Sequence, residues 1–254
     1  MSLEIIDAHM HPFLCKEEVV NNYPFDVPPA DIGADLARCG IDRFAGSVIC
    51  RPVEDFDAVR RANRDAMTLR EMYGGRYIPG IHIHPDYVRE SCEELERYAK
   101  EGVRLVGELV PYMMGWTRYT CPGAMEIFSL AQELGMTVSV HPSVPEDLDA
   151  LCAAFPRMNV IVAHPGEYND YMRNLERLER YPNAYLDICG TGLFRYQMLR
   201  YGVNRVGAER FLFGTDYPVC DPAMQVAAVE YERLTDAQRE LIFSGNFKRL
   251  LALD

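Results

Sequence analysis

Short runs of apolar and β-branched residues alternate with longer amphipathic stretches along this chain. Eight runs have the length and composition of strands, and the stretches between them repeat apolar residues with helical periodicity. Strands that alternate with helices on this scale form parallel sheets through crossover connections. The predicted strands are 3–9, 43–50, 77–84, 103–109, 136–141, 159–164, 184–189 and 210–216.

Boundary signals support several of the helices between these strands. Asp86 precedes a helix that we expect to run to about Lys100. Pro122 begins another helix, which we expect to end at Gly135. The residues Thr-Asp-Ala-Gln at 235–238 have the form of a capping box before the last helix.

The number of units favours a closed barrel. Eight strand–helix units over 254 residues average roughly 30 residues each, near the minimum for one unit. An open doubly wound sheet usually has a glycine-rich turn after its first strand, whereas this chain has His-Met-His-Pro at 9–12. The predicted fold class is therefore α/β, a single (β/α)8 TIM barrel with residues 1–254 as one domain.

Composition and charge narrow the classes of partner. Apolar residues make up 48% of the chain, and the net charge of −12 argues against binding to nucleic acid or to an anionic membrane. No uncharged run approaches the ~18 residues that span a bilayer. Glu4 and Asp7 interrupt the first apolar stretch, unlike a secretory signal, and the eight cysteines lack metal-ligand spacing. We expect a cytoplasmic protein with reduced thiols and a small-molecule substrate. The sequence leaves open whether the chain forms a homo-oligomer.

All the histidines of the chain fall at the carboxyl ends of predicted strands, which form the active face of an α/β barrel. His9 and His11 point to the same side of their strand, because side chains alternate with a period of two. A single histidine at a strand end is usually an ordinary polar residue, but six in this position indicate a metal site. The six are His9, His11, His82, His84, His141 and His164.

Two acids complete the predicted metal site. Glu108 lies in the apolar run Val-Gly-Glu-Leu-Val, and Asp216 ends the apolar run Phe-Leu-Phe-Gly-Thr-Asp. A buried carboxylate needs a cationic or hydrogen-bonding partner; a salt bridge or a helix cap would be the ordinary explanation. Beside several histidines, metal ligation or proton transfer is favoured. Imidazole and carboxylate ligands suit Zn²⁺ first, with Mn²⁺, Fe²⁺ or Co²⁺ as alternatives.

These motifs resemble those of the amidohydrolase superfamily, in the amidohydrolase-related branch that includes aminocarboxymuconate-semialdehyde decarboxylase. The similarity runs in the family's order along nearly the whole chain. The matching segments are Ile-Asp-Ala-His-Met-His-Pro (6–12), Val-Gly-Glu-Leu (106–109), Val-Ser-Val-His-Pro (138–142), Ile-Val-Ala-His-Pro-Gly (161–166), Phe-Gly-Thr-Asp-Tyr-Pro (213–218) and Gly-Asn-Phe-Lys-Arg-Leu-Leu (245–251).

The resemblance implies a barrel with one or two metals. In this family His9, His11 and Asp216 would hold the first metal. His141 and His164 would hold a second metal, or hold metal and substrate in turn. Many relatives carry a carbamylated lysine where this chain has Glu108, which resembles the subset with a bridging glutamate. The alternative is a one-metal site in which Glu108 hydrogen-bonds a ligand histidine.

The main functional prediction is a metal-dependent hydrolase of a small ester, amide or lactone that also carries a carboxylate. Metal-activated water would attack the substrate, Asp216 would move the proton and His164 would polarise the scissile oxygen. The loops after the first and fourth strands, 12–29 and 111–119, are expected to line the pocket, with Trp116 in the second. Candidate substrate contacts are Arg51, His84, Tyr112 and Tyr217.

Three other functions compete with hydrolysis. A non-oxidative decarboxylase of the same branch could use the same ligands, although the decarboxylases of this branch are generally longer. A metal-dependent deoxyribonuclease resembles the chain at Val-Gly-Glu, but the net charge opposes it. A non-catalytic ligand-binding barrel would keep the metal for structure, and structural sites have no open coordination position.

Overall fold

The computed structural model describes residues 3–21, 23, 27–51, 54–193 and 195–254. Eight parallel strands form one sheet in the order of the sequence. Each predicted strand is present, although the regular strands are shorter than their apolar runs. The strands are β1 (Ile6–Met10), β2 (Arg43–Gly46), β3 (Tyr77–Ile81), β4 (Leu105–Leu109), β5 (Thr137–Val140), β6 (Val160–Val162), β7 (Ala184–Asp187) and β8 (Phe211–Leu212).

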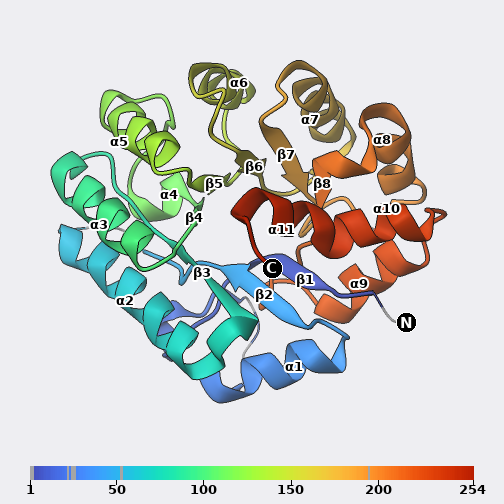
Figure 1. Cartoon of the computed structure of the whole chain (residues 1–254), viewed down its shortest axis with the longest axis horizontal. Coiled ribbons are helices and arrows are strands. Elements are labelled where there is room, and N and C mark those ends of the chain that lie inside the picture. Colours follow the sequence, from blue (N-terminus) through green and yellow to red (C-terminus); the bar gives the residue numbers. More distant parts are fainter. Residues whose placement is uncertain (1–2, 22, 24–26, 52–53, 194) are drawn as a thin grey trace.

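The last strand returns to the first and closes the sheet. The amide N of Ala8 donates to the carbonyl oxygen of Phe213 at 2.8 Å, and the amide N of His11 donates to that of Tyr217 at 2.7 Å. Met10 also forms an isolated parallel bridge with Tyr217. The closed sheet of parallel strands confirms the predicted (β/α)8 barrel (Figure 1).

Helices surround the barrel and cover the outer face of every strand (Figure 1). The capping box predicted at 235–238 is present: Gln238 N donates to Thr235 Oγ1, and Thr235 N donates to Gln238 Oε1. No helix of the described residues is long and apolar enough to cross a membrane. The helices are α1 (Ile32–Arg38), α2 (Phe56–Tyr73), α3 (Val88–Lys100), α4 (Pro111–Met114), α5 (Pro122–Glu133), α6 (Pro145–Ala154), α7 (Tyr168–Arg180), α8 (Met198–Val206), α9 (Pro222–Glu230), α10 (Asp236–Glu240) and α11 (Asn246–Leu251).

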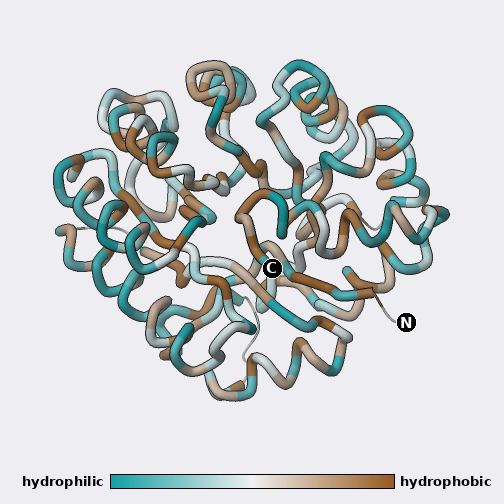
Figure 2. Tube along the Cα trace, in the orientation of Figure 1, coloured by the Kyte–Doolittle hydropathy of each residue, from teal (hydrophilic) through white to brown (hydrophobic). Residues whose placement is uncertain are grey.

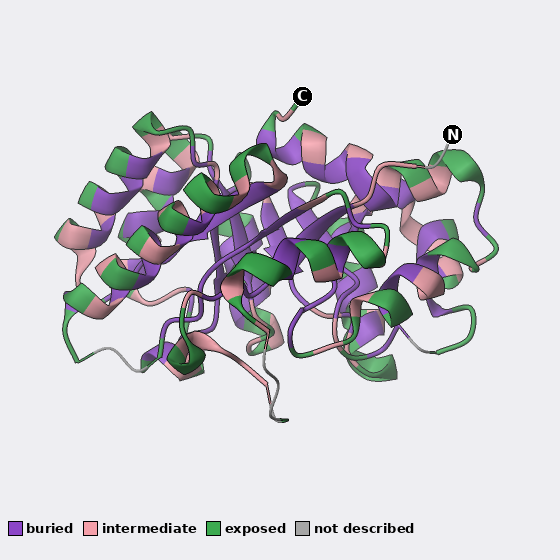
Figure 3. Cartoon of the chain, turned by 90° about the horizontal axis from the view of Figure 1, so that it is seen from below, coloured by how far each residue is buried: buried purple, intermediate pink, exposed green. Residues whose placement is uncertain are grey.

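The amino-terminal half of the barrel interior is packed with apolar side chains. Figure 2 shows hydrophobic strands inside a ring of helices with hydrophilic outer faces, and Figure 3 shows the same strands as the buried centre. Helix α11 closes this end with Phe247, Leu250 and Leu251. One residue or more from each of seven strands fills the interior beneath it: Ile6, Ala8, Ala45, Ile78, Leu105, Ile161, Tyr185 and Leu212.

Two irregularities in strand pairing change which side chains enter the barrel above this core. Between Val106 and Leu109, β4 has one residue more than the facing segment of β5, from Val138 to Val140. Leu105 belongs to the inner apolar cluster, and strict alternation would send Glu108 to the opposite face. The extra residue acts as a β-bulge and lets Glu108 point inward as well. A similar register shift occurs in β1 between Asp7 and Met10, next to His9.

Candidate metal centre

The six residues predicted to bind metal meet at the carboxyl end of the barrel. They come from five strands or the residues just after them, and none is freely exposed to solvent. His9, His11 and Glu108 are each at most 4% exposed, while His141 and His164 border a cavity. The structure thus brings together His9, His11, Glu108, His141, His164 and Asp216.

Glu108 lies at the centre of this cluster and divides it into two halves. Its Oε2 atom is 3.3 Å from Nε2 of His9 and 3.3 Å from Nε2 of His11. Its Oε1 atom is 2.8 Å from Nδ1 of His141 and 3.6 Å from Nε2 of His164. Each carboxylate oxygen therefore faces a different pair of imidazoles.

Asp216, which follows the neighbouring strand β8, approaches the half of the cluster that holds His9 and His11. Its Oδ1 atom is 3.4 Å from Nε2 of His11 and 3.8 Å from Nε2 of His9. The backbone of Asp216 has φ 60°, and that of His164 has φ 63°. Non-glycine residues rarely adopt this left-handed region, and such backbone strain concentrates at functional sites.

Burial and mutual charge shift the pKa values of these groups strongly. Burial alone would raise the pKa of Glu108, but the His9 charge and hydrogen bonds from His11, His141 and His9 bring it well below its usual range. Burial likewise opposes charge on His11, yet hydrogen bonds to Asp216 and Glu108 raise its pKa to about 9. The buried carboxylates thus favour positive charge at this place, whether from protons or from a cation.

The donor atoms fit a divalent metal. Two overlapping triads, His9–His11–Glu108 and Glu108–His141–His164, each have ligand atoms within 4.8 Å of one another. Imidazole nitrogen and carboxylate oxygen suit Zn²⁺, Mn²⁺ and Fe²⁺. Because Glu108 belongs to both triads, the arrangement is compatible with one metal or with two metals that share its carboxylate.

Two neighbouring residues that the sequence did not reveal orient the histidines. Asp187 is fully buried, and its Oδ2 atom is 2.8 Å from Nδ1 of His9. The thiol of Cys189 donates to Oδ1 of Asp187 at 2.8 Å and lies 3.2 Å from Nδ1 of His164. The carbonyl oxygen of Cys189 is 3.4 Å from the same Nδ1 atom. These acceptors favour protonated Nδ1 atoms, which leaves Nε2 of His9 and of His164 with the lone pair that ligates metal.

Gly190 makes the close packing around His164 sterically feasible. It has φ +66°, and a Cβ atom at this position would lie 2.6 Å from Nδ1 of His164. The same Cβ would lie 3.4 Å from Oδ2 of Asp216. Only glycine lets the main chain after β7 approach both side chains this closely.

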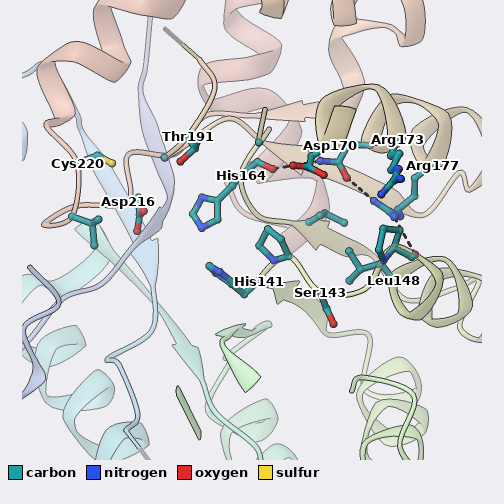
Figure 4. A pocket seen from close by; sticks show the side chains of 17 residues that line it. His141, Ser143, Leu148, His164, Asp170, Arg173, Arg177, Thr191, Asp216 and Cys220 are labelled. Carbon is teal, nitrogen blue, oxygen red and sulfur yellow. Dashed lines mark hydrogen bonds between the residues drawn. The ribbon is translucent and has the colours of Figure 1, made fainter. Parts of the chain in front are cut away.

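A cavity of about 420 Å³ leads outward from the second half of the cluster. Figure 4 shows His141, His164 and Asp216 at one end of it and Arg173 and Arg177 of α7 at the other. Arg177 is buried and donates to Asp149 and Asn174, at 2.7 and 2.5 Å. Within the described part of the chain, Arg173 forms no ion pair.

The predicted substrate residues do not gather in this cavity. Arg51 donates to the carbonyl oxygens of Glu17 and Val19, at 3.0 and 3.1 Å. The Nε2 atom of His84 is 3.2 Å from the carbonyl oxygen of Met114, and its Nδ1 atom accepts from the amide of Asp86. Both side chains support main-chain segments, and neither is among the residues that line the cavity.

The aromatic candidates occupy three different places. The ring of Tyr112 is 68% exposed and packs edge-on against His141, at 5.4 Å between centroids, so it lies at the rim. Tyr217 follows Asp216, but its hydroxyl reaches Asp35 at 3.4 Å. Trp116 is buried against Tyr119 and belongs to the core. Part of the loop 12–29, at 22 and 24–26, falls outside the described residues.

Comparison with known proteins identifies the family of this chain and agrees with its fold. A family model described as amidohydrolase matches residues 6–253. Gamma-resorcylate decarboxylase of Rhizobium radiobacter is 32% identical over 118 residues, which are 40% of this chain and 36% of the relative. The match therefore spans about a third of that relative's length.

Solved structures of decarboxylases have the same fold. A 2,6-dihydroxybenzoate decarboxylase from Rhizobium superposes with a TM-score of 0.78 at 19% identity, over 99% of both chains. A dihydroxybenzoic acid decarboxylase from Polaromonas, with bound manganese and the inhibitor 2-nitroresorcinol, superposes with a TM-score of 0.71 at 16% identity. It covers 99% of this chain and 97% of that one.

These relatives show that the prediction of hydrolysis was wrong. The chain is an enzyme of the amidohydrolase superfamily, and the relatives it matches at 32% identity are decarboxylases. The ligand set could not distinguish the reactions, because the same metal centre can activate water or bind a substrate carboxylate. Chain length did not distinguish the two reactions either, because a decarboxylase structure superposes over 99% of both chains.

Proposed function

We propose that this chain, which belongs to the amidohydrolase family, is a divalent-metal-dependent, non-oxidative decarboxylase of an aromatic carboxylic acid. Its 32% identity to gamma-resorcylate decarboxylase carries the proposal for the reaction. A hydroxylated benzoate such as 2,6-dihydroxybenzoate is the substrate class, by analogy with that relative and with the Rhizobium enzyme.

The cavity has a positively charged side chain at its outer end, as expected for a substrate that carries a carboxylate. It extends from the acids and imidazoles of the cluster to Arg173, which is an exposed residue and forms no ion pair in the described structure. A cation at the outer end attracts an anionic benzoate to a chain whose net charge is −12. The volume of about 420 Å³ suits a single substituted ring.

Mn²⁺ is our first choice of metal, because the Polaromonas decarboxylase binds manganese, and Zn²⁺ is the alternative that the ligand types allow. His9, His11, Glu108 and Asp216 would hold it, and His141 and His164 would hold a second ion or the substrate. A bound divalent ion supplies Lewis acidity, which stabilises negative charge on the substrate's carboxylate and hydroxyl oxygens.

The chain's own groups orient the substrate and move one proton. His141 and His164 form the wall of the cavity beside Glu108 and hold the ring against Asp216. The carboxyl group of Asp216 donates its proton to the ring carbon that carries the carboxylate. The bond between that carbon and the carboxylate then breaks, its electron pair returns to the ring, and CO₂ leaves. Asp216 remains as a carboxylate and regains a proton from solvent.

A panel of hydroxylated benzoates tests this proposal. The purified protein is loaded with Mn²⁺ or Zn²⁺ and incubated with the panel, and the loss of each acid is followed by chromatography. Aryl esters and lactones serve as controls for hydrolysis. We expect decarboxylated phenols from at least one benzoate and no products from the controls. Ester or lactone cleavage without loss of CO₂ from any acid would contradict the proposal.

A further inference from the structure

One buried acid of the barrel has no part in the proposed reaction. Asp7 lies on β1, two residues before His9, and its side chain is completely buried. Two main-chain amides and one hydroxyl group donate hydrogen bonds to its carboxylate. A carboxylate that is taken out of water needs such donors. The position of the donors indicates which parts of the barrel Asp7 holds together.

Two of these donors belong to Thr215, the residue before Asp216. The amide N of Thr215 donates to Oδ1 of Asp7 at 2.9 Å, and the hydroxyl group of Thr215 donates to Oδ2. Both oxygens of the carboxylate therefore bind the same residue. The amide N of His9 also donates to Oδ1, at 3.1 Å. Asp7 thus joins β1 near His9 to the segment after β8 that carries Asp216.

Thr215 extends this restraint to the other side of Asp216. Its Oγ1 atom accepts a hydrogen bond from the amide N of Tyr217 at 3.0 Å. The carbonyl oxygen of Tyr217 accepts from the amide N of His11 at 2.7 Å, and the amide N of Asp216 donates to the carbonyl oxygen of His9 at 2.8 Å. Hydrogen bonds therefore hold the main chain before, at and after Asp216.

The backbone conformation of Asp216 requires such restraint. Its φ of 60° lies in the left-handed region, where a non-glycine residue persists only if the surrounding structure over-determines it. In this conformation Oδ1 of Asp216 lies 3.4 Å from Nε2 of His11. A change of backbone conformation would redirect the side chain, and misplacing a reacting group by about 1 Å can lower a rate by about 100-fold.

We propose that Asp7 and Thr215 are positioning residues for the proton transfer by Asp216. They act through the main chain on both sides of Asp216 and not by contact with the substrate. This inference rests on the proposed function, which assigns the transferred proton to Asp216. One hydroxyl group, fully buried between β1 and the segment after β8, then controls the rate of the reaction.

Substitutions of Thr215 separate its hydroxyl group from its shape. Thr215→Val removes the hydroxyl group, and kcat for the best benzoate should fall by about 10- to 100-fold. Thr215→Ser keeps the hydroxyl group and should return kcat close to the wild-type value. KM and the Mn²⁺ content should stay near wild-type values in both, because the ligand side chains are unchanged. Asp7→Asn places an amide group opposite the Thr215 hydroxyl and should resemble Thr215→Val.

Thr137→Val is the matched control for the loss of a buried hydroxyl group. Thr137 is also fully buried on a strand, and its hydroxyl group donates to the carbonyl oxygen of Leu250 at 3.3 Å, at the apolar end of the barrel. The control should lower the melting temperature and leave kcat unchanged. Melting curves of all the variants verify that they fold.

A double-mutant cycle shows whether Thr215 acts through Asp216. In the Asp216→Asn background, Thr215→Val should cause no further loss of kcat, because the group that it positions is already absent. A full additional loss of kcat in that background would overturn the positioning role.

Crystal structures of the Thr215 variants test the inference without turnover. We expect the carboxylate of Asp216 to move away from His11 in Thr215→Val and to keep its place in Thr215→Ser. An unmoved carboxylate in Thr215→Val would overturn the positioning role, and so would a wild-type kcat in this variant or an equal loss of kcat in Thr137→Val. If the wild-type protein decarboxylates none of the benzoates but Asp216 moves as expected, only the proposed reaction is overturned.

Discussion

The two ends of the barrel interior are built from the same strands but bury opposite chemistry. On β4, Leu105 packs in the apolar cluster that α11 closes, while Glu108 lies among four imidazoles near the mouth. On β1, Ile6 packs in the same apolar cluster, whereas His9 belongs to the polar end near the mouth. The apolar end stabilises the fold through burial, whereas the polar end gathers desolvated charge that a cation can compensate. Substitutions at the two ends should therefore change different properties.

The largest effect should follow from removing both histidines of β1. His9→Ala combined with His11→Ala deletes two nitrogen ligands from one half of the cluster, so bound metal and metal-dependent turnover should fall to the background of metal-free protein. Elemental analysis after dialysis measures the first quantity, and circular dichroism checks that the barrel persists.

The other His-x-His pair provides a matched control for this change. His84→Gln alters a side chain of the same type whose ring nitrogens contact main-chain groups. It should keep the metal. Metal retention in the double variant, or equal loss in the control, would show that the β1 histidines have no special part in binding.

A substitution at the mouth should also separate chemistry from metal binding. Asp216→Asn keeps an oxygen toward His9 and His11 but cannot donate a carboxyl proton. Turnover should fall by about two to four orders of magnitude, the range for a lost general acid or base, with metal largely retained. Steady-state rates at a saturating benzoate concentration measure the change, and a rate near that of the wild type would exclude the proposed proton transfer.

A truncation at the opposite end should have the reverse profile. Ile161→Ala removes buried methyl groups from the apolar cluster beneath the metal centre. The free energy of unfolding should fall by about 2–5 kcal/mol, as for other large-to-small core changes. Urea denaturation measures this loss. The loss of kcat/KM can be converted to a free energy and compared with the loss in the free energy of unfolding. If the loss of kcat/KM were the larger, the separation between the two ends would be wrong.

The smallest effect in this series should come from a residue that orients a ligand. Asp187→Asn weakens the contact of 2.8 Å with Nδ1 of His9, and metal affinity should drop by about 10- to 100-fold. Competition with a chelator measures the affinity. Asp170→Asn, at an exposed acid that lines the cavity, is the control and should leave the metal affinity unchanged. An equal drop in both variants would point to general electrostatics in place of a specific contact.

The sequence predicted the barrel because its signals were local. Apolar runs marked all eight strands, and histidines at strand ends predicted where His9, His11, His141 and His164 would lie. The second His-x-His pair gave the same signal, yet His84 only supports a turn. Local spacing cannot show which strand ends point to the common centre.

The residues that the sequence did not reveal depend on contacts between distant strands. Asp187 ends an ordinary apolar strand, and its role follows only from the approach of β7 to His9 on β1. The inward direction of Glu108 depends on one extra residue in β4 relative to β5, which the sequence of β4 alone does not encode. The choice between hydrolysis and decarboxylation needed known relatives, because both reactions use the same ligand types.

The central claim is that this metal centre removes CO₂ from an aromatic acid. The most direct measurement is to titrate metal-free protein with Mn²⁺ and follow labelled CO₂ released from 2,6-dihydroxybenzoate that carries ¹³C in its carboxylate. We predict that ¹³CO₂ and 1,3-dihydroxybenzene appear in equal amounts and that the rate rises until one or two equivalents of metal are bound. Tight binding of Mn²⁺ without release of ¹³CO₂, or equal release without metal, would contradict the account.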